Sequence, residues 1–121
     1  GLLEWFLSTK GNISGYKNAI FSGITTLELS RIMENIFLKF SDIHGLWHVS
    51  SSPINKYDLL LEIKKVFKIP DVNISIDHKI VYDRTLDGSK FLKHTKYVIP
   101  DWDKMIKDLY KNSHLDKNYN V

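Results

Sequence analysis

The fold class is decided by the stretch Lys17-Asn18-Ala19-Ile20-Phe21-Ser22-Gly23-Ile24-Thr25-Thr26-Leu27-Glu28-Leu29. Its first five residues are typical of a short strand that ends at the Ser-Gly pair. Thr25 and Glu28 then have the spacing of a capping box, which predicts a helix over about 26–40. That helix is expected to bury an apolar stripe at helical spacing: Leu29, Ile32, Met33, Ile36, Phe37 and Phe40. A strand followed directly by a capped helix predicts an α/β fold.

Outward from this stretch, the pattern predicts helices with a few short strands. Asn55 and Asp58 repeat the capping signal, and Pro70 ends the helix that they begin. The other expected elements are helices over 2–8, over 87–93 and from Pro100 onward, strands over 45–50 and 73–76, a turn region over 10–16 and a loop over 77–86. We expect one domain over residues 1–110 and a polar tail over 111–121 that frays.

Composition and charge exclude several classes of protein. With 121 residues, 43% of them hydrophobic and 26% charged, the chain is neither disordered nor able to span a membrane with an apolar run of roughly 18 residues. The net charge of +3 comes from interleaved acids and bases, which argues against nucleic acid as a partner but allows one or two phosphates in a pocket. The absence of cysteine excludes a disulfide framework, thiol catalysis and thiolate metal sites.

The first residues carry two further expectations. There is no basic leader before Leu2, so with the lack of cysteine we expect a cytoplasmic protein. An apolar helix that starts at Leu2 has only Gly1 to cap it, which predicts that the domain began earlier in a longer parent chain.

Motifs for catalysis and cofactor binding are absent from the sequence. It has no Gly-x-Gly-x-x-Gly turn, no Walker loop and no Gly-x-Ser-x-Gly elbow. His44 and His48 lie four apart, but Gly45 and an expected strand separate them, so we assign them structural or exposed roles rather than metal binding. The aspartates are scattered over expected loops, where solvated and capping roles are the ordinary interpretation.

Two features favour anion binding. The backbone N–H groups of the Phe21-Ser22-Gly23 turn lie at a helix start and can bind an anion, although an ordinary capped connection has the same sequence. Arg84 is one of only two arginines, and its planar guanidinium suits phosphate, although Asp83 or Asp87 can simply pair with it.

Six segments carry a family resemblance when taken in order: Leu2–Leu7, Asn18–Leu29, Gly45–Ser50, Lys56–Leu60, Asp83–Phe91 and Pro100–Ile106. Together they resemble the C-terminal part of the dTDP-4-dehydrorhamnose reductase family, a branch of the extended short-chain dehydrogenases. The resemblance covers about residues 2–110. It implies a small C-terminal lobe that covers a nucleotide-linked sugar, beside an N-terminal Rossmann domain that binds NAD(P) and carries a catalytic Tyr-x-x-x-Lys pair.

The chain departs from the family because that first part is missing: none of its six tyrosines has a lysine four residues later. Catalytic and cofactor-binding residues therefore cannot be carried over. The resemblance assigns Arg84 to the nucleotide's phosphates and Phe21, Ser22 and Gly23 to the nucleotide side of the pocket, with Lys17 and Tyr57 as neighbours.

The expected function is the substrate-binding part of an NAD(P)-dependent enzyme that reduces or epimerises a nucleotide-linked sugar, inactive alone. The alternative is a non-catalytic binding or regulatory module that kept this lobe. An upstream Tyr-x-x-x-Lys pair and glycine fingerprint would favour the enzyme.

Overall fold

The computed structural model describes residues 1–119 of the chain, with side chains through residue 113. These residues form five helices and a three-stranded sheet, which confirms the α/β class. They divide into two compact units. We call Gly1–Phe21 with Pro53–Arg84 the sheet unit, and Ser22–Ser52 with the chain from Thr85 onward the helical unit. Within the described residues, no helix has the length and apolar character needed to cross a membrane.

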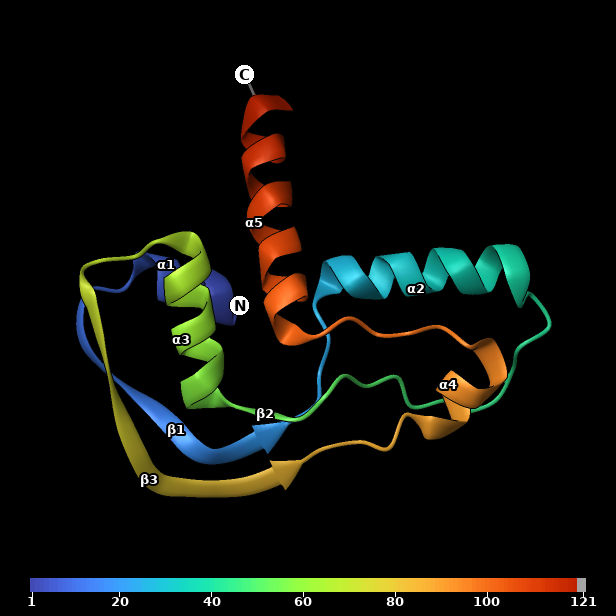
Figure 1. Ribbon diagram of the computed structural model, residues 1–121, viewed down its shortest axis with the longest axis horizontal. Helices are drawn as coiled ribbons and strands as arrows, with labels where there is room; N and C mark the ends of the chain where they lie inside the picture. The colour runs from blue at the N-terminus through green and yellow to red at the C-terminus, as the bar shows by residue number, and fades with distance from the viewer. Residues whose placement is uncertain (120–121) are drawn as a thin grey trace. The chain divides into compact units, whose positions relative to one another are not determined.

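The sheet unit is built on strands β1 (Gly11–Phe21), β2 (Ile54–Asn55) and β3 (Val72–Arg84), in the order β2-β1-β3. Strands β1 and β3 run parallel and side by side (Figure 1), with a register irregularity after Tyr16. The expected turn over 10–16 and loop over 77–86 are therefore wrong over residues 11–16 and 77–84, which are strand. Their polar side chains hide this, because pairing between the two backbones satisfies N–H and C=O groups whatever the side chains are.

Helices α1 (Leu2–Ser8) and α3 (Lys56–Phe67) complete the sheet unit. Asn55 caps α3 as predicted, its side-chain oxygen accepting a hydrogen bond from the N–H of Asp58 at 2.8 Å. Gly15 of β1 allows α3 to approach, because an added Cβ there would lie 2.7 Å from the ring of Tyr57. The buried apolar side chains of this unit are Phe6, Ala19, Leu59, Leu60, Ile63, Val72 and Ile74.

The helical unit contains α2 (Thr26–Lys39), α4 (Ser89–Thr95) and α5 (Trp102–Tyr119). Thr25 caps α2 as predicted, its hydroxyl accepting from the N–H of Glu28 at 3.1 Å. The predicted buried stripe is wrong in most of its members: Ile32 is buried, but Met33 is 60% and Phe37 80% exposed. Glu28 turns inward instead, because its carboxylate accepts a hydrogen bond from the Tyr97 hydroxyl.

Three expected boundaries in the helical unit also differ from the structure. Residues 45–50 form no strand, and the Trp47 indole N–H closes a local turn on the His44 carbonyl at 2.7 Å. Helix α4 begins at Ser89, two residues later than expected. Helix α5 begins at Trp102, two residues after Pro100, and ends at Tyr119, while residues 120–121 lie outside the described residues.

Candidate functional site

The candidate site lies in the sheet unit, where the two parallel strands end. Phe21 and Arg84 are partners in the last registered pair of β1 and β3, and Ala19 and Tyr82 form the pair two residues before. Side chains at such alternate positions project from the same face of a sheet. Phe21, Tyr82 and Arg84 therefore share one face at the carboxyl edge of the parallel pair, which is the edge where open α/β sheets usually bind ligands.

Two cations and two aromatic rings meet at this edge. The Arg84 guanidinium lies 4.6 Å from the centre of the Tyr82 ring, and the Lys56 ammonium lies 4.2 Å from the centre of the Phe21 ring. Both distances are within the range of a cation–π interaction. Lys56 is the first residue of α3, so helix and strand both contribute to the site. We call Lys56 and Arg84 the cation pair.

The two positive charges of the cation pair favour the binding of an anion. Burial lowers the pKa of Lys56 below its ordinary value, and the positive charge of Arg84 lowers it further. Among the side chains that the structure describes, neither Lys56 nor Arg84 forms an ion pair with a carboxylate. A bound anion would relieve this repulsion, because an opposite charge nearby stabilises the charged form of an amine.

A cavity adjoins the cation pair within the sheet unit. It has a volume of about 290 Å³, close to the lower end of small-molecule pockets. Lys56 and Tyr82 are part of both the cavity wall and the site at the strand ends. The remaining lining residues come from α1, the two long strands and α3: Leu2, Trp5, Ser14, Tyr16, Leu60 and Ile80. Trp5 is 48% and Tyr16 38% exposed, so both rings are open to a planar ligand.

Lys17 and Tyr57 form a different cluster. The Lys17 ammonium contacts the Asp58 carboxylate at 3.1 Å and lies 5.2 Å from the centre of the Tyr57 ring. Tyr57 packs on Gly15, and Asp58 also accepts a hydrogen bond from the Asn55 side chain at 2.8 Å. The charge of Lys17 is therefore already paired, which distinguishes it from Lys56 and indicates a structural role.

Ser22 and Gly23 follow Phe21 in the chain but belong to the helical unit. Ser22 is 3% exposed, and its hydroxyl accepts from the N–H of Leu86 at 2.8 Å while its carbonyl accepts from the N–H of Ser51 at 3.0 Å. The Gly23 carbonyl accepts from the Ser51 hydroxyl at 2.6 Å. These groups hold the turn together, which matches the ordinary-connection alternative for this segment.

Sequence reasoning placed Phe21 and Arg84 among the site residues but did not assign Lys56 or Tyr82 to the site. Tyr82 lay in an expected loop, where nothing fixed its neighbours. Lys56 did carry a signal, because it occupies the first position of a helix, where the helix dipole favours acidic residues over cations. A lysine in that unfavourable position indicates that its charge serves another purpose.

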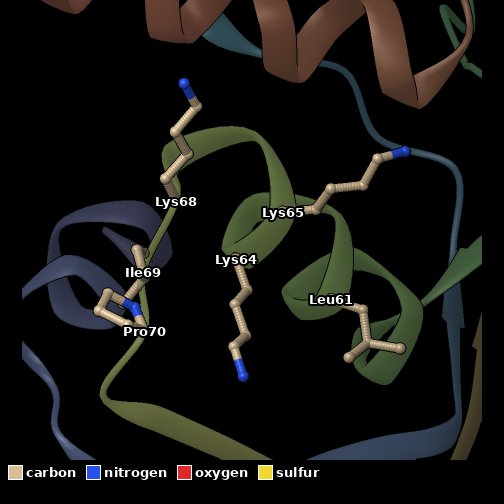
Figure 2. A pocket seen from close by; sticks show the side chains of 6 residues that line it. All are labelled: Leu61, Lys64, Lys65, Lys68, Ile69 and Pro70. Carbon is tan, nitrogen blue, oxygen red and sulfur yellow. The ribbon is translucent and has the colours of Figure 1, made fainter.

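A larger hollow lies on α3 and the residues that follow it. It has a volume of about 450 Å³ and is lined by Leu61, Lys64, Lys65, Lys68, Ile69 and Pro70. Figure 2 shows the three ammonium groups directed away from one another, so that they do not converge on one point. Lysine stems cover this hollow while their charges reach solvent, which is the ordinary behaviour of lysines on an apolar surface.

Comparisons with known proteins gave matches among solved structures alone: no family model and no curated protein sequence matches the chain. One match is a dTDP-4-dehydrorhamnose reductase from Clostridium acetobutylicum, with a TM-score of 0.76 and 15% identity over 94% of this chain. Another is the Bacillus anthracis dTDP-4-dehydrorhamnose reductase crystallised with NADP, with a TM-score of 0.73 and 13% identity over 92% of this chain. The chain spans 44% and 41% of the lengths of those two proteins. It thus shares the fold of part of these reductases.

At Gly15 and Gly88 the chain lacks the open space that a dinucleotide needs. A dinucleotide turn needs glycines whose missing side chains leave room for a pyrophosphate. Here the space beside Gly15 is filled by Tyr57, and a Cβ on Gly88 would lie 2.6 Å from the Ser50 hydroxyl oxygen. Among the side chains that the structure describes, through residue 113, no three histidine, aspartate or glutamate groups gather in a way that could hold a metal ion.

Proposed function

We propose that the chain is the substrate-binding lobe, over residues 1–110, of an NAD(P)-dependent enzyme that reduces or epimerises a nucleotide-linked sugar in the cytoplasm. The observation that carries this proposal is the cation pair of Lys56 and Arg84, which lacks a carboxylate partner among the described side chains. Its position at the carboxyl ends of parallel strands, in a fold shared with part of two dTDP-4-dehydrorhamnose reductases, supports a diphosphate as the anion.

In this proposal, each group at the site has a separate task. Arg84 offers two parallel N–H donors to a phosphate, and Lys56 adds a point charge. The rings of Trp5, Tyr16 and Tyr82 stack on the nucleoside or sugar. Hydride and proton transfer belong to a Rossmann domain that carries the cofactor and the Tyr-x-x-x-Lys pair, so the lobe binds and orients the substrate without turning it over.

The test is an amide proton–nitrogen NMR titration of the chain with dTDP-, UDP- and GDP-sugars, and separately with NADPH. We expect one nucleotide sugar to shift the amides of Phe21, Lys56, Tyr82 and Arg84, and NADPH to shift none. Arg84→Ala should weaken binding by about tenfold or more, since a hydrogen bond to a charged group contributes roughly 1.5–3 kcal/mol.

Lys65→Ala serves as the matched control, because Lys65 is exposed on the same helix and does not line the cavity of the site. Its affinity should equal that of the wild type. Equal affinity for Arg84→Ala and the wild type would overturn the proposed site. Shifts centred on Lys64, Lys65 and Lys68 would instead move the anion to the hollow of Figure 2.

A further inference from the structure

The amine of Lys56 has an environment that differs from that of an ordinary surface lysine. It is half-buried, lies over the Phe21 ring and forms part of the wall of the 290 Å³ cavity. Trp5 and Tyr16 provide aromatic surface in the same cavity. The amine is thus confined, yet it faces a space that a small planar molecule can enter.

The charges around Lys56 favour its neutral form. Burial and the neighbouring Arg84 both lower its pKa, so more of its amine is unprotonated at neutral pH than in a solvated lysine. The titratable or charged groups that face it are Arg84 and Tyr82 of β3 and Tyr16 of β1, while α1 contributes only Leu2 and Trp5 to the cavity. The neutral amine is the nucleophilic form of lysine.

Arg84 adds selectivity for anionic reactants. Its guanidinium lies over Tyr82, whose ring lines the cavity with Lys56. A molecule that places an aldehyde at the Lys56 amine and a phosphate at Arg84 would satisfy both groups at once. Holding two reacting groups together in this way raises their effective concentration.

We propose that Lys56 is a covalent modification site for planar aldehydes that carry a phosphate, with Arg84 as the phosphate anchor and the aromatic cavity as the binding space. The neutral amine adds its lone pair to the aldehyde carbon as the C=O π bond breaks, the nitrogen gives up one proton, and the carbonyl oxygen takes up one proton, which gives a carbinolamine. Loss of water then forms the C=N bond of an imine, and addition of water reverses the reaction. No oxidant or reductant is consumed.

This inference rests on the cation pair of the proposed function but makes a separate claim, namely that Lys56 is reactive. A nucleotide sugar bound across the pair should shield Lys56 from the aldehyde. The two proposals can fail independently, because nucleotide-sugar binding is measured on unreacted protein and imine formation needs no nucleotide.

The probe is pyridoxal 5′-phosphate, with cyanoborohydride to trap the imine and peptide mass spectrometry to locate the label. At neutral pH and limiting probe, we expect Lys56 to carry several-fold more label than Lys64 or Lys65, which lie on the same helix. Pyridoxal without the phosphate should label Lys56 less. Arg84→Ala should reduce labelling by the phosphate form to the level of pyridoxal, and Arg84→Lys should retain part of the difference.

Lys65→Arg is the matched control and should leave the labelling of Lys56 unchanged. Amide spectra of each variant show whether it is folded before labelling is compared. Label spread evenly over the lysines would overturn the proposal. Equal labelling of Lys56 by pyridoxal and its phosphate would overturn the role of Arg84. Selective labelling without nucleotide-sugar binding would leave this inference standing and remove the proposed function.

Discussion

The two arginines of the chain lie in opposite surroundings. Arg31, in the helical unit, contacts Asp108 at 2.7 Å and Glu28 at 3.5 Å, and the Tyr97 hydroxyl donates to Glu28 at 2.5 Å. Arg84, in the sheet unit, lies over the Tyr82 ring, beside a second cation and without a carboxylate partner among the described side chains. The positive charge of Arg31 is therefore neutralised by carboxylates, whereas that of Arg84 is not.

This difference separates charges that hold the fold from charges that are available to a ligand. The hydrogen bond from Arg31 lowers the pKa of Asp108, which means that the folded state favours the charged carboxylate. Burial and Arg84 lower the pKa of Lys56, which means that the folded state disfavours the charged amine. A fold that keeps an unfavourable charge does so at a cost in stability, and such departures are concentrated at functional sites.

The largest expected effect on stability comes from removing a carboxylate that Arg31 contacts. Glu28→Ala removes a carboxylate that is only 2% exposed and leaves the Tyr97 hydroxyl without its acceptor. We expect the free energy of unfolding to fall by about 2 kcal/mol, the typical loss for a hydrogen bond to a buried charged group. Urea denaturation followed by circular dichroism measures it.

Glu34→Ala is the control on the same helix, because Glu34 is exposed. Its free energy of unfolding should stay within roughly 0.5 kcal/mol of the wild type. If the two variants had equal stability, the interactions of Glu28 with Arg31 and Tyr97 would not stabilise the helical unit.

A second prediction concerns the pH at which this network is lost. Burial, together with the hydrogen bond to Glu28, raises the pKa of Tyr97 to about 12, from 10.0 in the unfolded chain. The fold therefore favours the neutral phenol, so this contribution is fully present below pH 10 and is lost as the pH rises toward 12. Ultraviolet absorbance followed to high pH should show a late ionisation step, and Tyr97→Phe should remove that step. An unchanged late step in Tyr97→Phe would assign it to another tyrosine.

The same contrast explains what the sequence could and could not predict. The caps at Thr25 and Asn55 were predicted correctly because capping depends on residues three positions apart. Strand β3 was missed over most of its length because its partner, β1, lies about sixty positions away in the chain, and its own side chains are mostly polar.

The candidate site was predicted in part for a similar reason. Arg84 was singled out by its chemistry, since the planar guanidinium of an arginine suits phosphate, and the family resemblance then assigned it to the phosphates. Its partner Lys56 depends on the register that aligns Phe21 with Arg84 and on the helix that begins beside them. Neither is a local property of the sequence.

The smallest expected effect is a gain in stability, and it tests the cation pair of Lys56 and Arg84. Lys56→Met keeps a long side chain over the Phe21 ring but removes a charge that burial and Arg84 disfavour. We expect the free energy of unfolding to rise slightly, by about 0.5 kcal/mol. Lys65→Met, at an exposed position of the same helix, should leave it unchanged.

The reason for that rise can be checked with a second substitution. If repulsion contributes, Lys56→Met should stabilise the Arg84→Ala variant less than it stabilises the wild type, since one of the two repelling charges is already gone. An equal gain in both backgrounds would leave burial alone as the cause of the shift in the Lys56 pKa. A loss of stability in Lys56→Met would place Lys56 with Glu28 among the charges that hold the fold, and the cation pair would then lose its claim to be a binding site.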